Sequence, residues 1–240
     1  GAVAAFIMVG SSIPNFGMGP IFIRDIARYP ERAGKYLTST LFMQTLLGLL
    51  AGLGRVAQNV VLRNIAMTYI EFIRGVPILV LIFTIAFVIV PAAAGALSIF
   101  GLDNTSVSQT TRAIIALALI YGAFLAEIFR AGIESVARGQ MEAARSLGMT
   151  HVQAMRHVVL PQAIRNVLPA IGNDFIAMLK DSSLVSVLGV RDLTQGSRLY
   201  ASTSFQFKET YYTLSYFYLV MTLILSLLLQ WLQRRMRRNV

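Results

Sequence analysis

The sequence predicts an all-α integral membrane protein. Of its 240 residues, 56% are hydrophobic and only 13% are charged, whereas about a quarter of the residues in a soluble domain are charged. Several apolar stretches approach the roughly 20 residues that a helix needs to cross a bilayer. Basic residues gather beside these stretches, so the net charge of +10 indicates membrane orientation and contact with anionic lipid rather than nucleic-acid binding.

The composition also excludes several kinds of site. The chain has no cysteine, which rules out disulfides, thiolate metal sites and a cysteine nucleophile. His151 and His157 are six residues apart and share no helix face, so we expect no metal site. No Gly-rich phosphate loop of the G-x-x-x-x-G-K-S/T type occurs. The chain is therefore not predicted to bind a cofactor or to hydrolyse ATP itself.

Residues 1–35 receive no assignment from the sequence. The stretch Ala2 to Gly10 is too short to span a bilayer and lacks the basic flank of a signal peptide. The segment is either a surface helix or part of a truncated span, because the chain begins with Gly rather than Met. Its basic residues conflict with the positive-inside rule if five spans follow; they are Arg24, Arg28, Arg32 and Lys35.

We predict a transmembrane permease domain over residues 36–233, with about five spans. Gly48 and Gly52 in the first span have the small-xxx-small spacing that permits close helix contact, although glycine is also common in membrane helices. Four stretches meet or nearly meet the length test, and a fifth is apolar but interrupted. The four lie near 37–54, 65–93, 113–129 and 211–231, and the interrupted one lies at 163–190.

The second predicted span carries Glu71, Arg74 and Pro77 before its apolar run. Pro77 removes a backbone donor and can kink the helix. Glu71 and Arg74 stand at i,i+3, so they can pair with each other or simply mark the cytoplasmic end. The small and polar residues from Pro91 to Thr111 predict an external loop.

Charged residues also mark the inner ends of the later spans. Glu127 precedes Arg130 by three residues, and we predict that the two form an ion pair rather than line a transport path. Tyrosines gather at the start of the last span, Trp231 ends it, and residues 234–240 form a basic tail. Aromatic belts and a basic stop place the C-terminus in the cytoplasm.

Residues 138–162 form a polar stretch between apolar ones, and burying its charges in hydrocarbon would cost roughly 2.5–3.5 kcal/mol each. We predict a cytoplasmic helix-turn-helix, with Gly148 ending the first helix and Thr150 starting the second. The second helix is predicted to end at Pro161. Because the stretch lacks a concave polar cluster, it is typical of a docking element rather than a catalytic one. Its apolar stripe consists of Val152, Met155, Val158 and Val159.

The spacing within this stretch resembles the EAA signature of ABC importer permeases. Glu142-Ala143-Ala144 is followed after three residues by Gly148, and after nine more by Val158, one residue and Leu160-Pro161. The one departure from the signature is Val158, where isoleucine is usual.

Four further segments are similar to motifs of the histidine/glutamine-type permeases for polar amino acids. The resemblance covers residues from about 37 to 233, and the first 30 or so residues match no known pattern. The segments are Tyr69–Pro77 (Y-x-E-x-x-R-G-x-P), Ala126–Ile133 (A-E-x-x-R-x-G-I), Gly172–Ile176 and Leu179–Leu184.

This resemblance implies a MetI-like permease fold in a bacterial inner membrane. It further implies a second permease subunit of the same or a related kind, ATPase subunits that bind ATP and Mg beneath the membrane, and an external solute-binding protein. In such importers the EAA helices sit in clefts of the ATPases. The residues expected to carry this coupling are Glu142, Ala143, Ala144, Gly148, Leu160 and Pro161.

The interrupted span 163–190 is the candidate substrate site. Pro169 and Gly172 are expected to weaken its helix, and transporters build binding sites from broken helices. Asp174 and Asp181 are seven residues apart and share a helix face. Asp174 either recognises a substrate ammonium or guanidinium group, or binds Lys180 or a backbone group and only fixes the bundle. The candidate substrate residues are Asn173, Asp174, Met178, Asp181 and Ser182.

The sequence therefore predicts the permease subunit of an ATP-driven importer for polar amino acids, basic ones included, working by alternating access. The same kind of permease for another small polar solute, such as an opine or cystine, is the alternative. An intramembrane lipid-modifying enzyme or a passive channel is more remote, because the spans lack a catalytic cluster and a channel needs no ATPase dock.

Overall fold

The computed structural model describes residues 30–237 except 56, 58 and 99–106. The described part is helical and contains no strand. Most of the predicted segment 1–35 lies outside the described residues, as do the last three residues of the predicted tail 234–240. The boundary expected at residue 36 falls inside the first described helix, α3 (Pro30–Arg55).

Helix α3 packs against α7 (Gln109–Glu134) along a line of small residues. A Cβ atom added at Gly48 would lie 2.9 Å from Leu125 Cβ and 3.2 Å from the Gly122 carbonyl oxygen. A Cβ atom at Gly52 would lie 3.3 Å from the Ala126 carbonyl oxygen. The predicted role of Gly48 and Gly52 in close helix contact is confirmed.

The predicted single span 65–93 is wrong, because the helix ends before Pro77 and a new one starts after it. Helix α4 (Val60–Gly75) starts at Asn59, whose side chain accepts a hydrogen bond from the Val61 amide at 2.9 Å, and it ends before Pro77. Val76 has φ −110° and ψ 140°, the extended conformation that a following proline imposes. A new helix, α5 (Ile78–Thr84), follows. Pro77 therefore separates two helices instead of kinking one.

Pro91, in contrast, lies inside a helix, so the predicted loop 91–111 is too long. Between α5 and α6 (Val90–Ser98) lies a π-helical turn, η2 (Ile85–Ile89), in which the Val90 amide donates to the Ile85 carbonyl. Since Pro91 has no N–H, the Ala86 carbonyl loses its helical donor. Arg112 Nη1 donates to that carbonyl at 3.4 Å, which explains a basic residue at this end of α7.

The C-terminal half contains a long helix, α10 (Leu160–Asp181), that continues past Pro169 and Gly172. The expectation that these residues break the helix is wrong, since Gly172 instead admits the Leu229 side chain of α12 (Phe207–Arg237). The α-helix gives way only after Asp181, to a tighter helical segment, η4 (Ser182–Leu188), which ends at Gly189 with φ +74°. The main core forms where α5, η2, α7 and η4 meet.

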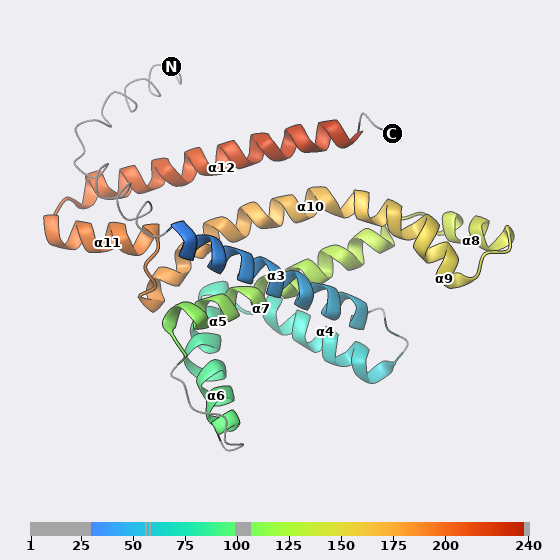
Figure 1. The fold of residues 1–240 in the computed structure, drawn as a ribbon, viewed down its shortest axis with the longest axis horizontal. Helices are drawn as coiled ribbons and strands as arrows, with labels where there is room; N and C mark the ends of the chain where they lie inside the picture. The colour runs from blue at the N-terminus through green and yellow to red at the C-terminus, as the bar shows by residue number, and fades with distance from the viewer. Residues whose placement is uncertain (1–29, 56, 58, 99–106, 238–240) are drawn as a thin grey trace.

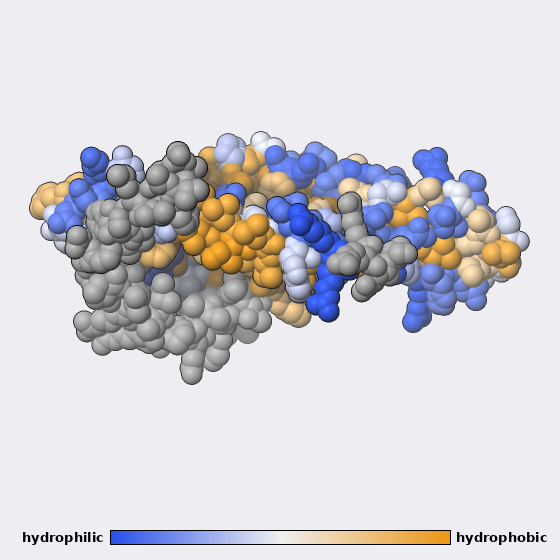
Figure 2. Space-filling model, turned by 90° about the horizontal axis from the view of Figure 1, so that it is seen from above, coloured by the Kyte–Doolittle hydropathy of each residue, from blue (hydrophilic) through white to orange (hydrophobic). Residues whose placement is uncertain are grey.

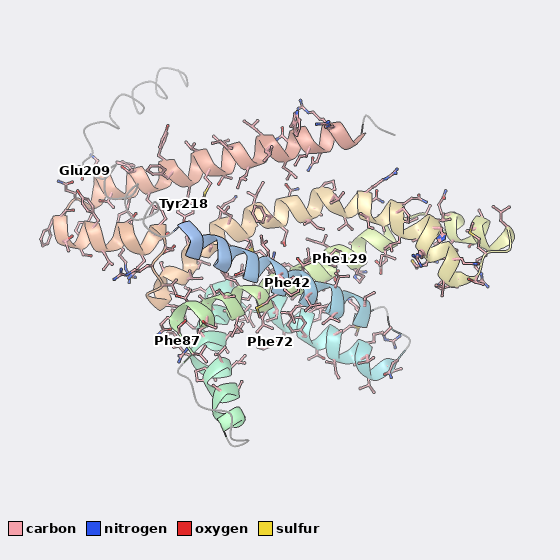
Figure 3. The ribbon with its side chains drawn as sticks, viewed as in Figure 1. Phe42, Phe72, Phe87, Phe129, Glu209 and Tyr218 are labelled. Carbon is pink, nitrogen blue, oxygen red and sulfur yellow. The ribbon has the colours of Figure 1, made fainter. Side chains whose placement is uncertain are left out.

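Helix α11 (Leu193–Ser204) was not predicted from the sequence. The Asp192 side chain caps it by accepting a hydrogen bond from the Gln195 amide at 2.7 Å. The Tyr218 hydroxyl of α12 lies 3.1 Å from Thr194 Oγ1 and ties α11 to α12 (Figure 3). The spacing of Asp192 and Gln195 is a helix-start signal that would have located this helix.

Three of the described helices are long and apolar enough to cross a membrane: Ile78–Ala96, Gln109–Glu134 and Phe207–Arg235. Helix α10, which carries the predicted span 163–190, does not meet this measure, since it contains polar side chains such as Asp174 and Lys180. The predicted span 37–54 begins in the part of α3 whose side chains the structure does not describe, so the measure does not decide it. The count of five spans therefore stays a prediction. In Figure 1, α3, α7, α10 and α12 run roughly along the long axis of the molecule.

Replacing Gly48 by alanine should destabilise the contact between α3 and α7. The added methyl group meets Leu125 Cβ and the Gly122 backbone, which cannot move without shifting α7, and overpacking of this kind costs roughly 1–3 kcal/mol. The melting temperature of the purified protein in detergent measures the effect. Gly196→Ala is the matched control, because a Cβ atom there meets no atom within 4 Å; an equal loss in both variants would contradict the prediction.

Candidate functional site

The predicted helix-turn-helix is present and projects from one end of the molecule, where α8 (Arg138–Ser146) and α9 (His151–Ala154) lie (Figure 1). Gly148 ends the first helix with φ +84°, a conformation that strongly favours glycine. The Met149 amide donates to the Ala144 carbonyl at 3.2 Å, and the Gly148 amide donates to the Arg145 carbonyl at 3.0 Å. These two bonds form a Schellman cap, so the predicted role of Gly148 in the turn is confirmed.

The second helix begins at Thr150, as predicted. Its hydroxyl accepts a hydrogen bond from the Gln153 amide at 3.3 Å, and the Gln153 side chain accepts one from the Thr150 amide at 2.9 Å. This reciprocal capping box satisfies two amides at the helix start. The two ends of the turn are thus both fixed by hydrogen bonds.

The expectation that the second helix ends at Pro161 is wrong. A π-helical turn, η3 (Met155–Val159), carries the helix into α10, with the Leu160 amide donating to the Met155 carbonyl. The wider turn accommodates Pro161, which has no N–H to donate. Gln162 Nε2 donates to the Val158 carbonyl at 2.9 Å. Helix α9 of the hairpin and α10 are therefore parts of one continuous helix that runs from His151 to Asp181.

The base of the hairpin is fixed to both of its supporting helices. Val136, Val159 and Ala163 form a small buried core there. Asn166 Nδ2 of α10 donates to Ser135 Oγ, in the link between α7 and α8, at 2.8 Å. A Cβ atom at Gly132 of α7 would overlap the Val167 side chain, so the two helices touch closely. The hairpin, the end of α7 and the start of α10 form one packed unit.

The predicted coupling residues are not equally accessible. Glu142, Ala143 and Gly148 are exposed, but Ala144 is buried. Of the two alanines only Ala143 is available to a partner, because Ala144 packs within the hairpin. Among the residues that the structure describes, the Glu142 carboxylate has no hydrogen bond or ion pair. Leu160 and Pro161 lie at the start of α10 and are also exposed.

The tip of the hairpin carries two exposed apolar residues. Leu147 is 82% exposed and Val152 is 73% exposed. Leu147 was missed by the sequence analysis, and Val152 lies outside the packed stripe to which it was assigned. Figure 2 shows apolar surface among polar surface at the end of the molecule where Figure 1 places α8 and α9. Exposed basic residues lie along the hairpin and at its base; they are Arg138, Arg145, Arg156 and Arg165.

The candidate substrate residues divide into two groups. Met178 is buried in the core, Ser182 Oγ donates to the Leu179 carbonyl at 2.7 Å, and the Tyr121 hydroxyl donates to Asp181 Oδ2 at 2.7 Å. These contacts are structural, and the last offsets the cost of a carboxylate at a helix C-terminus. Asn173 is exposed and Asp174 is half-buried.

Asp174 does not pair with Lys180. No ion pair of Asp174 occurs among the described residues, so the alternative in which Lys180 neutralises it is wrong. Of the two aspartates in this region, Asp181 accepts a hydrogen bond from Tyr121, whereas the Asp174 carboxylate has no hydrogen bond or ion pair with the described residues.

A second polar cluster joins three helices. Glu127 of α7 forms the predicted ion pair with Arg130, and Arg55 Nη1 of α3 donates to Glu127 Oε2 at 2.8 Å. Arg74 Nη1 of α4 lies 3.9 Å from Glu127 Oε1. The local Glu71–Arg74 pair that their spacing allowed does not form, because Arg74 points to Glu127 and Glu71 lies 3.7 Å from Arg55.

The comparisons with known proteins agree with this architecture. Residues 44–238 match the family described as the inner membrane component of binding-protein-dependent transport systems. A probable amino-acid permease protein, YxeN from Bacillus subtilis, is 43% identical over 178 residues, which cover 74% of this chain and 76% of that protein. The glutamine transport system permease protein GlnP from Escherichia coli is 35% identical over 191 residues, covering 80% of this chain and 83% of that protein.

The fold is also similar to that of a solved transporter. The crystal structure of an amino acid ABC transporter with histidines matches with a TM-score of 0.73 and 42% identity, covering 84% of this chain and 89% of that one. The predicted all-α permease fold is confirmed. The chain therefore belongs to the family of inner membrane components of binding-protein-dependent transport systems, and it is a transporter subunit.

Proposed function

We propose that this chain is the permease subunit of an amino-acid ABC importer and that its hairpin, residues 138–162, receives the movement of partner ATPase subunits. Family membership and the named relatives support the first statement. The observation that carries the second is the rigidly capped hairpin with Leu147 and Val152 exposed at its tip. ATP and Mg bind to the partner ATPases, and this chain itself binds no cofactor.

The hairpin surface favours a protein partner with an apolar cleft and an acidic border. Leu147 and Val152 supply the apolar centre, and burying such side chains drives association. The exposed arginines of the hairpin and its base supply positive charge. This charge improves the rate and orientation of docking to an acidic surface. Glu142 remains available to accept a hydrogen bond from the partner.

We further propose that the transported solute is a polar amino acid, with Asp174 recognising a cationic group when the substrate is basic. Two observations support this assignment. Asp174 is half-buried without a basic partner in the described chain. A charged group at membrane depth is energetically costly, so its presence there favours a functional role. The similar amino acid ABC transporter was solved with histidines. Asn173, next to Asp174, is the second exposed candidate for substrate contact.

The transport cycle follows from this arrangement. ATP-driven closure of the ATPase pair moves the hairpin, and the helical bundle alternates between inward-facing and outward-facing states. A second permease subunit completes the path, and an external solute-binding protein delivers the amino acid. The chain lies in the bacterial inner membrane with its C-terminus in the cytoplasm, supported by the basic residues that follow Trp231 at the end of the last span.

Experiments can separate the proposed function from its alternatives. An opine or cystine permease would have the same architecture, and uptake competition by a panel of amino acids in the reconstituted complex separates it from the main proposal. A passive channel or a lipid-modifying enzyme would not need an ATPase dock. Transport by the purified chain without any ATPase would contradict the importer proposal.

Replacing Leu147 by serine should weaken ATPase binding and leave the permease folded. Removing one apolar side chain from a docked surface costs roughly 1.5–3 kcal/mol, which is about tenfold or more in affinity. The measurement is the amount of ATPase that co-purifies in detergent. Leu199→Ser is the control, because Leu199 is 52% exposed on α11, which lies at the opposite end of the molecule (Figure 1). Equal loss of ATPase in the two variants would contradict the docking assignment.

Replacing Gly148 by alanine should loosen the turn. A Cβ atom at Gly148 meets nothing within 4 Å, so the cost is conformational, about 1–2 kcal/mol for an L-residue in the left-handed region. We expect faster amide hydrogen exchange over residues 138–159 and reduced ATPase stimulation by substrate. Gly139→Ala, also in open space but on α8, should not raise exchange. The proposal fails if the two variants behave alike.

Replacing Asp174 by asparagine should impair uptake of cationic substrates most, by about tenfold if one charged hydrogen bond of roughly 1.5–3 kcal/mol is lost. Initial uptake rates in proteoliposomes, compared for cationic and neutral amino acids, test this. Asp181→Asn is the control, because its side-chain oxygen can still accept from Tyr121. An equal reduction for all substrates in Asp174→Asn would indicate structural support instead.

A further inference from the structure

The ion cluster around Glu127 joins helices that are distant in sequence. Arg55 comes from α3, Arg74 from α4, and Arg130 from α7 itself, and all three guanidinium groups lie within ion-pair distance of the one Glu127 carboxylate. The Glu127 side chain is only 19% exposed, whereas the peripheral carboxylates Glu71 and Glu134 are 66% and 60% exposed. Glu127 is therefore the central group of the cluster.

Shielding makes this cluster different from an ordinary surface ion pair. Exposed pairs contribute little because water screens them and their side chains stay mobile. Removing one partner of a shielded pair leaves the other charge without compensation. Loss of Glu127 would leave three arginines facing one another, whereas loss of Glu134 would remove only one contact of Arg130.

The cluster lies between the hairpin and the non-helical link at Val76 and Pro77, which separates α4 from α5. Glu127 is on α7, seven residues before its end at Glu134, and only residues 135–137 separate α7 from α8. Arg74 is the penultimate residue of α4, directly before the break at Val76 and Pro77. A Cβ atom at Gly75 meets nothing within 4 Å, so this end of α4 has no close neighbour at Gly75. Ile73, beside Arg74, is buried in the main core, and ion pairing of Arg74 to Glu127 adds a second connection between this end of α4 and the helix that carries the hairpin.

We propose that Glu127 is a positioning residue that makes α4 follow the movement of the hairpin. Arg74 connects α4 to Glu127, Arg55 connects α3 to it, and the break at residues 76 and 77 lets α4 turn relative to α5. The ion cluster is the joint through which hairpin displacement reaches the first half of the chain. This inference rests on the proposed coupling function of the hairpin.

The test compares Glu127→Gln with Glu134→Gln in the complete reconstituted transporter. Both changes neutralise a carboxylate on α7 that pairs with Arg130, but only Glu127 contacts α3 and α4. We expect Glu127→Gln to lower amino-acid uptake per ATP hydrolysed by about fivefold or more. Glu134→Gln should match the wild type, and Glu127→Asp should restore part of the coupling.

A distance measurement separates this joint from a general loss of structure. The chain has no cysteine, so spin labels can be placed on α4 and α12 through introduced cysteines, for example at the exposed Asn64 and Leu227. The label distance should change between nucleotide-free and ATP-bound complexes in the wild type and not in Glu127→Gln. Arg74→Gln removes only the α4 connection and should give the same result if Glu127→Gln does not fold.

The outcomes are distinct. The proposed joint would be overturned if Glu127→Gln and Arg74→Gln both kept the uptake per ATP of the wild type and the same ATP-dependent change in label distance. The importer function would then remain intact. A wild type that shows no ATP-driven uptake would overturn the proposed function instead. A fall in coupling that is equal in Glu127→Gln and Glu134→Gln would show that Arg130, and not the link to α4, is what matters.

Discussion

Close backbone contact along α7 is the interaction on which the rest of the structure depends. Small residues on both sides let α3 approach at Gly48 and Gly52, and let α10 approach at Gly132. Helices in a bilayer gain no hydrophobic stabilisation from meeting each other, so van der Waals contact at short range must hold them together. Because α7 also carries Tyr121 and Glu127, this packing brings the polar groups of three neighbouring helices to defined positions.

Proline has two different effects at three positions of this chain, and the neighbouring hydrogen bonds decide which one occurs. At Pro77 the preceding residue takes an extended conformation and the helix stops. At Pro91 and Pro161 a π-helical turn precedes the proline and the helix continues. Arg112 supplies the missing donor near Pro91, and Gln162 donates to a carbonyl near Pro161. Pro77 has no such side-chain donor among the described contacts.

These effects explain what the sequence could and could not predict. The hairpin turn was predictable because Gly148 and Thr150 act through bonds to residues within five positions of themselves. The break at Pro77 and the continuity at Pro161 depend on donors and packing from elsewhere in the fold, so a single sequence does not distinguish them. Asp181 looked like a substrate group for the same reason, since its partner Tyr121 is 60 residues away.

The continuity of α10 changes how the two proposed sites relate to each other. A broken helix would place a flexible joint between the hairpin and Asp174, and part of any displacement would be lost there. The observed helix runs without a break from Leu160 to Asp181, so Leu160 and Asp174 are about 21 Å apart along one rod at 1.5 Å per residue. Helices transmit force along their axis because their hydrogen-bond ladders resist extension. Under the proposed coupling, displacement of the hairpin would therefore move Asp174 as well, and the Tyr121–Asp181 bond would pass the same movement to α7.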